Sequence, residues 1–179
     1  GKPLPSLNIE IWDEDNKPLP QGKVGQIAVS GPTVMEGYLT EDGPVDAGLY
    51  KTEDGTKWVL TGDLAYIDED GYLWFMGRSK RLVIISGYNV YPGDIEKLLT
   101  ELDFIKESCA VQGFDAEGKK LIRLYVVADG ADENAEEYNL QIIELCSARL
   151  DKFSVPRDIR YIDALPRTRL EKVDFMSLT

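Results

Sequence analysis

The stretch Leu82-Val-Ile-Ile-Ser-Gly-Tyr-Asn-Val-Tyr-Pro-Gly-Asp-Ile-Glu-Lys-Leu-Leu-Thr-Glu-Leu102 shows how strand and helix follow one another in this sequence. Leu82–Ile85 is fully apolar and is followed by Ser-Gly, which predicts a short buried strand. Pro92 is tolerated in the first turn of a helix. The apolar residues after it recur at the spacing of one helical face: Ile95, Leu98, Leu99 and Leu102.

The residues after this stretch repeat the alternation. Apolar segments at Ser108–Gln112 and Leu121–Ala128 predict two more strands, and Ile159–Asp163 predicts a last one. A second long helix is expected before it because four apolar residues share one face: Ile142, Leu145, Cys146 and Leu150. The order strand–helix–strand–strand–helix–strand predicts a small α+β domain with helices packed on a sheet.

The residues before this stretch have the pattern of β structure. The turn Asp68-Glu-Asp-Gly71 predicts a hairpin, because Gly takes a positive φ without steric cost. The β pattern ends near Gly77-Arg78, so we expect one domain over residues 1–77 and a second over residues 78–179. Alternating apolar residues predict strands of the first domain at residues 7–11, 26–30, 64–68 and 72–76.

The charge of the chain excludes two classes of partner. Its 179 residues contain 20 Lys and Arg against 32 Asp and Glu, a formal net charge of −12. Such a balance repels a phosphate backbone and an anionic bilayer, so neither nucleic-acid nor membrane binding is expected as the main function. No apolar run approaches the roughly 20 residues of a membrane-spanning helix, and no signal peptide opens the sequence.

The cysteine and histidine content restricts the chemistry. Cys109 and Cys146 both stand among apolar neighbours, which favours two buried, reduced thiols and a cytoplasmic protein. Histidine is absent, which removes Ser-His-Asp and Cys-His catalysis and His-based metal sites; no metal ligands are expected in this chain. The first residue is Gly rather than Met, so we expect a piece of a longer polypeptide.

Two segments near the domain boundary carry polar groups that packing does not require. In Thr61-Gly-Asp63, a carboxylate on a tight Gly turn could accept hydrogen bonds from the vicinal hydroxyls of a ribose, or could cap its own turn. In Gly77-Arg-Ser-Lys-Arg81, Arg78 could form paired hydrogen bonds with a ribose or a phosphate, or the cations could keep a linker solvated.

Two further segments lie in the second domain. Gly87 could let the backbone approach a ligand closely, or could form a bend before the helix. Lys172 stands in the loop Leu165–Asp174 after the last strand, where a Lys is ordinarily exposed to solvent. As a catalytic group it would supply a mobile positive charge for anionic oxygens.

Taken in order, the motifs of this chain resemble the later core motifs of the adenylate-forming superfamily. That superfamily comprises acyl-CoA synthetases, adenylation domains of peptide synthetases, and luciferases. The match extends over nearly the whole chain, and the segment around Gly87 is most similar to acyl-CoA synthetases. The matching segments are Gly25–Gly31, Met35–Leu39, Trp58 with Thr61–Asp63, Gly71 to Arg78, Ser86–Glu96, Val155-Pro156, and Leu165–Asp174.

The resemblance implies a two-step reaction. A small carboxylic acid attacks the α-phosphate of ATP to give an acyl-adenylate and pyrophosphate, and a thiol, commonly that of coenzyme A, then displaces AMP. By motif, Asp63 and Arg78 would bind the ribose, and Lys80 would occupy a hinge. Gly87 would lie on a strand that borders the tunnel for the thiol. Lys172 would bridge the substrate carboxylate and the α-phosphate.

The same resemblance implies the fold and the partners. Residues 1–77 would be the C-terminal part of a distorted β-barrel subdomain of the large adenylation domain, and residues 78–179 a mobile α+β lid. The phosphate loop, the Thr-Glu magnesium motif and the acid pocket of the family do not occur in these 179 residues. ATP, Mg²⁺ and CoA would therefore belong to a parent enzyme with an upstream adenylation domain. We expect none of them bound to this piece, which would be inactive alone.

Two alternatives stay open at this point. The chain could come from an adenylation domain that loads an amino or aryl acid onto a carrier protein. It could also be a degenerate family member kept for protein–protein interaction, because Glu171 stands where the family usually has Gly before the catalytic Lys.

Overall fold

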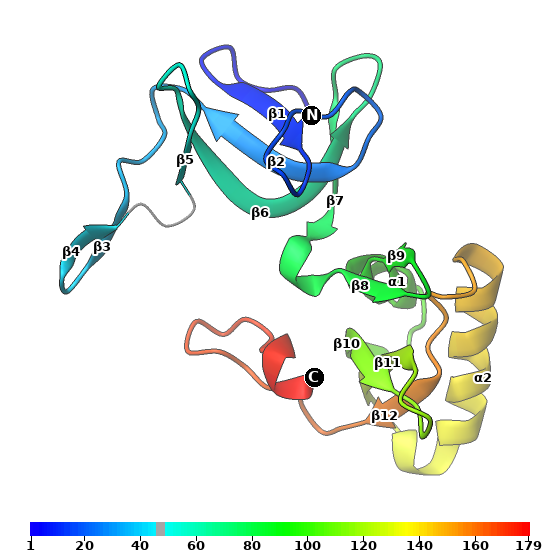
Figure 1. Cartoon of the computed structure of the whole chain (residues 1–179). Coiled ribbons are helices and arrows are strands. Elements are labelled where there is room, and N and C mark those ends of the chain that lie inside the picture. Colours follow the sequence, from blue (N-terminus) through cyan, green and yellow to red (C-terminus); the bar gives the residue numbers. More distant parts are fainter. Residues whose placement is uncertain (46–48) are drawn as a thin grey trace. The chain divides into compact units, whose positions relative to one another are not determined.

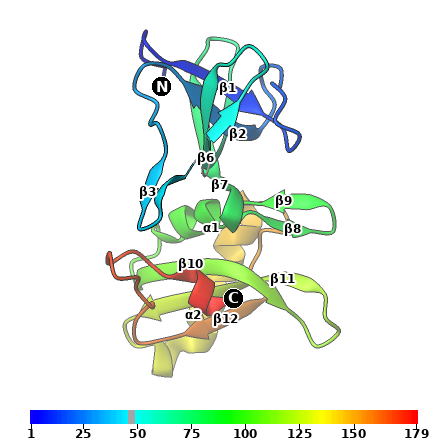
Figure 2. The same cartoon turned by 60° about the vertical axis from the view of Figure 1, so that its left-hand side comes forward.

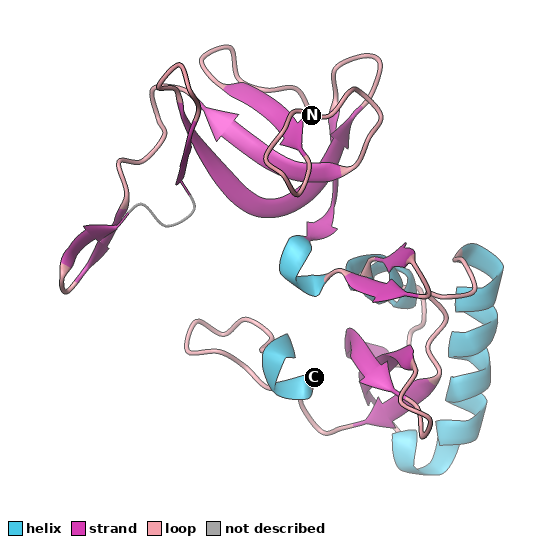
Figure 3. Cartoon of the chain, viewed as in Figure 1, coloured by secondary structure: helices cyan, strands magenta, loops and turns pink. Residues whose placement is uncertain are grey.

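The computed structural model describes residues 1–45 and 49–179 and divides the chain into two compact units, Gly1–Lys80 and Arg81–Thr179 (Figure 1). The units meet a few residues after the expected boundary at Gly77-Arg78, and the assignment of residues 1–77 and 78–179 to two family domains stays a prediction. The expected mixed α+β class is confirmed: the first unit contains strands and the second contains both helices and strands (Figure 3).

The first unit is built on the long strand β6, which pairs with three other strands. The strands of the main sheet lie in the order β1-β2-β6-β5, β7 also pairs with β6, and all these pairs are antiparallel. The hairpin β3–β4 forms a separate two-stranded sheet. The bounds are β1 Asn8–Trp12, β2 Gly25–Ser30, β3 Tyr38–Thr40, β4 Gly43–Val45, β5 Leu49–Lys51, β6 Lys57–Ile67 and β7 Leu73–Arg78.

Alternation along β1 and β2 gives this sheet two apolar faces. Ile11 packs in one buried cluster with Ile27 and Ala65, whereas its neighbour Trp12 packs in another. This follows from the strand geometry, in which successive side chains point to opposite faces. Trp12 meets Tyr50 edge to face, with ring centroids 5.3 Å apart. The strands expected at residues 7–11, 26–30 and 72–76 are confirmed within two residues as β1, β2 and β7. The strand expected at 64–68 is the end of the longer β6, and β3, β4 and β5 were not expected.

The second unit has the expected order of elements with one strand and two short helices added. The strands β10-β11-β12 form its sheet, with β10 and β11 antiparallel and β11 and β12 parallel. The bounds are η1 Ser79–Arg81 (which enters from the first unit), β8 Val83–Ile85, β9 Tyr88–Val90, α1 Pro92–Leu99, β10 Ile105–Phe114, β11 Lys120–Ala128, α2 Ala131–Arg149, β12 Asp158–Tyr161 and η2 Phe175–Leu178.

The sheet of the second unit is covered on both faces. Leu124 and Val126 of β11 contribute to the cluster that includes residues of α1 and α2. Cys109 and Val111 of β10 contribute to the opposite cluster, which includes Leu165 and other residues of the C-terminal segment. The sheet therefore lies between the helices and the C-terminal segment (Figure 2). This packing fixes the base of the loop that contains Lys172.

Helix α1 is shorter than its apolar pattern suggests. It ends at Leu99 because the backbone then tightens: the N–H of Leu102 donates to the carbonyl of Leu99, three residues earlier, at 3.1 Å. Leu102 still packs on the core from this turn. The helical periodicity of side chains therefore extends past the helix itself.

The buried, reduced state expected for the two thiols is confirmed. Cys109 and Cys146 are both buried and free. Burial raises the pKa of Cys109 to about 12, with a further contribution from Glu96, and raises the pKa of Cys146 to about 11. Both thiols are therefore protonated near neutral pH. Over the described ranges, no helix is long and apolar enough to cross a membrane.

Candidate functional site

Asp63 lies in a bulge of strand β6 and not on a turn between two strands. Leu60 pairs with Ala28 and Leu64 pairs with Gln26, so residues 61–63 of β6 stand opposite a single residue of β2. Gly62 has φ +76°, a value that Gly takes freely, which explains the Gly at this point. The expected turn was wrong because a Gly between two apolar segments is typical of a bulge as well as of a turn.

The bulge brings Asp63 to Arg78, the residue directly paired with it on β7. Arg78 Nε lies 3.1 Å from Asp63 Oδ1; the Arg78 side chain is 65% exposed and that of Asp63 is 25% exposed. Asp63 Oδ1 is buried and makes no hydrogen bond within the described part of the chain. The two residues predicted to bind a ribose are thus neighbours, and the carboxylate keeps acceptor capacity.

Lys80 is exposed in η1, between two residues that are each fixed to a different unit. Ser79 Oγ donates to the carbonyl of Gly62 in the first unit, at 3.0 Å. Arg81 forms an ion pair with Glu96 of α1 in the second unit. The backbone at Lys80 therefore joins two separately anchored neighbours.

Arg81 makes further contacts within the second unit besides its ion pair with Glu96. Burial disfavours its cation, but the Glu96 carboxylate outweighs that cost and raises the pKa of Arg81. Arg81 Nη2 also donates to the carbonyl of Ala110 at 3.2 Å, and its guanidinium lies 5.2 Å from the centre of the Phe175 ring. Arg81 thus links α1, β10 and η2 of the second unit.

Gly87 lies at the tip of the hairpin β8–β9. Ile85 pairs with Tyr88, so Ser86 and Gly87 form a two-residue loop in which both φ angles are positive, +51° and +83°. This is the pattern of a type I′ turn, whose twist matches that of the flanking strands. The bend expected before the helix is therefore a hairpin, and the strand β9 that follows it was missed because Tyr-Asn-Val is too short to give a pattern.

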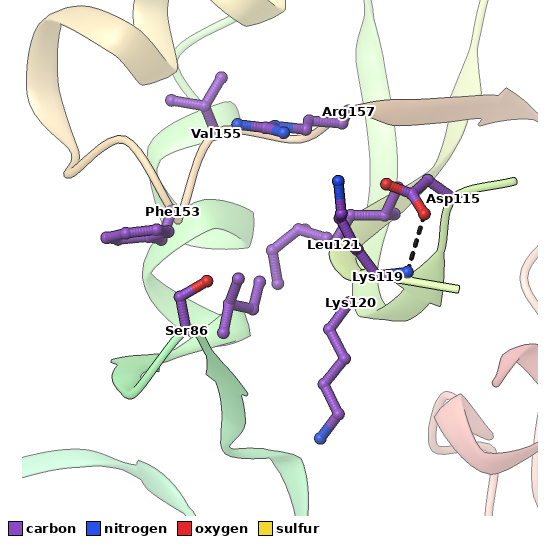
Figure 4. Close-up of a pocket in the computed structure, with 10 residues that line it drawn as sticks. Ser86, Asp115, Lys119, Lys120, Leu121, Phe153, Val155 and Arg157 are labelled. Carbon is purple, nitrogen blue, oxygen red and sulfur yellow. Dashed lines mark hydrogen bonds between the residues drawn. The ribbon is translucent and has the colours of Figure 1, made fainter. Parts of the chain in front are cut away.

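A pocket of about 300 Å³ lies beside this hairpin, within the second unit. Figure 4 shows Ser86 and Phe153 on one side of it, and Asp115, Lys119 and Arg157 on the other. Lys120 brings a third cation to the lining. The apolar part of the lining consists of Ile85, Leu121, Ile122, Phe153 and Val155.

The chemistry of this pocket suits an anion that has an apolar part. The carboxylate of Asp115 accepts the backbone N–H groups of Glu117 and Lys119, at 3.0 and 2.8 Å, so it is occupied by its own turn. Sequence reasoning missed the three cations of the pocket. The signal available was the pair Lys119-Lys120, directly after a turn in an acidic chain.

Lys172 is exposed on a hairpin formed by the C-terminal segment. The N–H of Thr168 donates to the carbonyl of Lys172 at 2.8 Å, and the N–H of Glu171 donates to the carbonyl of Thr168 at 3.0 Å. Glu171 has φ +60°, a left-handed conformation that costs a residue with a side chain about 1–2 kcal/mol. Gly adopts this backbone conformation without that cost.

The structure thus brings one pair of the predicted residues together and keeps two others apart. Asp63 and Arg78 lie together in the first unit. In the second unit, the hairpin β8–β9 and the red C-terminal segment lie apart in both views (Figures 1 and 2). Among the side chains that the structure describes, no group of three or more Cys, Asp and Glu is arranged to hold a metal ion.

Two family models match the chain. The model described as AMP-binding enzyme matches residues 1–39, and that described as AMP-binding enzyme C-terminal domain matches residues 94–172. A long-chain-fatty-acid–CoA ligase of Yersinia pestis is 32% identical over 97% of this chain and 29% of its own length. An indoleacetate–CoA ligase of Aromatoleum aromaticum is 33% identical over 97% of this chain and 32% of its own length.

Solved structures agree with these relatives. The o-succinylbenzoate CoA synthetase of Bacillus subtilis, in complex with its acyl-adenylate intermediate, has a TM-score of 0.82 at 30% identity. The match covers 100% of this chain and 35% of that one. ATP-bound MatB from Rhodopseudomonas palustris has a TM-score of 0.78 at 34% identity, over 99% of this chain and 34% of that one. The chain thus spans about a third or less of the length of these proteins.

Proposed function

Because this chain belongs to the AMP-binding superfamily and is of its acid–CoA ligase type, we propose that it works as part of an enzyme that joins a carboxylic acid to coenzyme A. In the first step a carboxylate oxygen bonds to the α-phosphorus of ATP and pyrophosphate leaves. In the second, the thiol sulfur bonds to the acyl carbon and AMP leaves. The observation that carries the proposal is the exposed Lys172 hairpin on a base fixed by packing.

Lys172 serves the first step. Two anions must meet when the carboxylate approaches the α-phosphate, and an ammonium between them offsets their repulsion. The hairpin supports this role because its base is packed in the core while Lys172 itself is exposed. Asp63 and Arg78 hold the nucleotide by its ribose, the carboxylate accepting hydrogen bonds from the vicinal hydroxyls and the guanidinium donating to oxygens.

Gly87 and the pocket beside it serve the second step. CoA carries phosphates on its nucleotide end and an apolar, uncharged arm that ends in the thiol. The three cations of the pocket and its apolar floor suit such a ligand, and this favours CoA over a carrier-protein thiol. Gly87, at the adjoining tip, leaves room for the arm, since no atom lies within 4 Å of where its Cβ would be.

Lys80 is the hinge in this proposal. Ser79 and Arg81 are each anchored to a different unit, so rotation at Lys80 would turn the second unit without breaking either anchor. Lys172 and Gly87 lie apart in the second unit. This supports a lid, residues 78–179, that turns Lys172 toward the nucleotide in the first step and Gly87 toward it in the second. Residues 1–77 then end the barrel subdomain of the large domain.

ATP, Mg²⁺ and the acid are bound mainly by an upstream adenylation domain of the same polypeptide. Structures of relatives support these cofactors for the parent enzyme. The MatB structure holds ATP, and a second structure of the Bacillus subtilis o-succinylbenzoate CoA synthetase holds ATP and a magnesium ion. The phosphate loop and the Thr-Glu motif are not among these 179 residues. The chain alone therefore should not bind ATP appreciably or release pyrophosphate.

One observation favours a second candidate, a degenerate family member kept for protein–protein interaction: Glu171 occupies a left-handed position. The experiment joins the chain to an upstream adenylation domain and compares Lys172→Ala with Arg169→Ala, an exposed cation of the same hairpin. Loss of pyrophosphate release only in Lys172→Ala, with thioester formation from supplied adenylate spared, supports the ligase. No activity in the parent or either variant supports the degenerate member.

A further inference from the structure

Five hairpin turns in the described residues share one hydrogen-bond pattern. In each, the N–H of the first residue donates to the carbonyl of the fifth, and the N–H of the fourth donates to the carbonyl of the first. This is a type I turn followed by one left-handed residue. The turns are residues 13–17, 52–56, 68–72, 115–119 and 168–172, and their fourth residues are Asn16, Gly55, Gly71, Gly118 and Glu171, with φ of +59°, +87°, +79°, +77° and +60°.

The fourth position distinguishes the Lys172 turn from the others. Gly takes a positive φ freely and Asn tolerates it, because its short amide bonds locally, whereas Glu has neither advantage. Thr168 Oγ1 accepts the N–H of Leu170 at 3.3 Å. The first-position Asp residues of the other turns accept two backbone N–H groups each, those of the third and the fifth residue. The bond of Thr168 ends at the N–H of Leu170 and does not include the peptide between Glu171 and Lys172.

Arg167 supplies a contact at the strained residue. Its Nη1 donates to the carbonyl of Glu171 at 3.3 Å, and its Nη2 donates to the carboxylate of Glu107 on β10. Arg167 and Glu107 are 38% and 40% exposed, so solvent only partly screens the pair. The guanidinium therefore ties the peptide that follows Glu171 to the sheet.

That peptide is the one that joins Glu171 to Lys172, so its plane sets where the Lys172 side chain begins. We infer that Arg167, anchored by Glu107, is a positioning residue that holds this peptide in place in the turn whose left-handed residue is Glu rather than Gly or Asn. The inference deepens the proposed function and rests on it, because the position of this peptide matters for catalysis only if Lys172 acts in the reaction. The backbone part of the inference stands on the contacts alone.

The test uses amide hydrogen exchange on the 179-residue chain itself, read by NMR. The variants are Arg167→Met, Glu171→Gly and the two combined. Arg160→Met is the matched control, because Arg160 is also a half-exposed arginine, paired with Asp158 in the same unit. The amides of Asp115 and Gly118 form the same turn elsewhere in the second unit and serve as the internal reference.

Arg167→Met should speed exchange at Thr168 and Glu171 about tenfold while Asp115 and Gly118 keep their rates. Adding Glu171→Gly should restore slow exchange, because Gly holds the left-handed conformation without the tie. Unchanged exchange at Thr168 and Glu171, an equal change at the reference turn or in Arg160→Met, or failure of Glu171→Gly to restore protection would each overturn the inference. The measurement needs no nucleotide, so it is separate from the pyrophosphate assay that tests Lys172.

Discussion

Arg78 Nε lies 3.1 Å from Asp63 Oδ1, on positions that pair directly across β7 and β6. The two residues are 15 apart in the sequence, and the antiparallel register brings them together. The extra residues of the bulge at Gly62 place Asp63 in that register. A pair with one partner largely exposed is a weak source of stability, which agrees with the nucleotide-binding role proposed for it.

We therefore predict that Asp63→Asn and Arg78→Gln each change the unfolding free energy of the chain by less than about 1 kcal/mol. Urea denaturation measures this. In a polypeptide that includes the adenylation domain, the same variants should raise KM for ATP, because the ribose loses its partners. Strong destabilisation with an unchanged KM would show that the pair is structural.

The ion pair Arg81–Glu96 should behave in the opposite way. Its side chains are only 23% and 21% exposed, and Glu96 also accepts the N–H of Ala110 at 2.9 Å. Arg81→Met should destabilise the second unit by about 2 kcal/mol, because it leaves a poorly solvated carboxylate without its cation. Thermal unfolding measures the loss. A combined Arg81→Met and Glu96→Gln variant should lose less than the sum of the single changes; strict additivity would contradict the coupling.

Asp158 makes the stability of the second unit depend on pH. Partial burial opposes its ionisation, but hydrogen bonds from Arg123 and then Arg160 outweigh burial and hold the pKa of Asp158 below its usual range. Because the native pKa is lowered, ionised Asp158 stabilises the fold. This contribution is present in full above the unfolded pKa of about 3.9, and it is lost as the pH falls through the native pKa.

Asp158→Asn should thus cost about 1–2 kcal/mol at pH 7 and flatten the loss of stability below pH 4. Urea denaturation between pH 7 and pH 3 measures both effects. Asp163→Asn is the control, since Asp163 is exposed. An equal effect of the two substitutions would contradict the role of the arginines.

The pKa shifts of the two thiols are upward, opposite to that of Asp158. The pKa values of Cys109 and Cys146, raised to about 12 and about 11, mean that the folded chain keeps both thiols protonated well above the unfolded value near 8.5. A disulfide reagent at pH 8 should therefore label neither thiol until urea unfolds the second unit. Rapid labelling of the folded chain would contradict this burial.

The sequence predicted most of the elements because their patterns are local. The apolar stripe of α1 and the alternation in β1 and β2 appear within a few residues each. Strands of three residues, such as β9, contain too few residues for a pattern. The sequence around Gly62 predicts a turn instead of the bulge, because only the pairing with β2 distinguishes the two.

The candidate residues came from the order of motifs, whereas their supports depend on distant contacts. Arg167 meets Glu107 and Arg81 meets Glu96 across separations that no local pattern encodes. The cationic pocket likewise combines Lys119 and Lys120 with Arg157, which the sheet alone brings together. The departure at Glu171 was visible in the sequence, but its left-handed backbone was not.

We propose that Lys172 and the pocket beside Gly87 serve different steps of the reaction. The most direct measurement determines both half-reactions in a polypeptide that joins this chain to an adenylation domain, for Lys172→Ala and Arg157→Met. Lys172→Ala should slow pyrophosphate release about 100-fold or more and spare thioester formation from supplied adenylate. Arg157→Met should raise KM for CoA and leave pyrophosphate release unchanged. Equal loss of both half-reactions in both variants would contradict the claim.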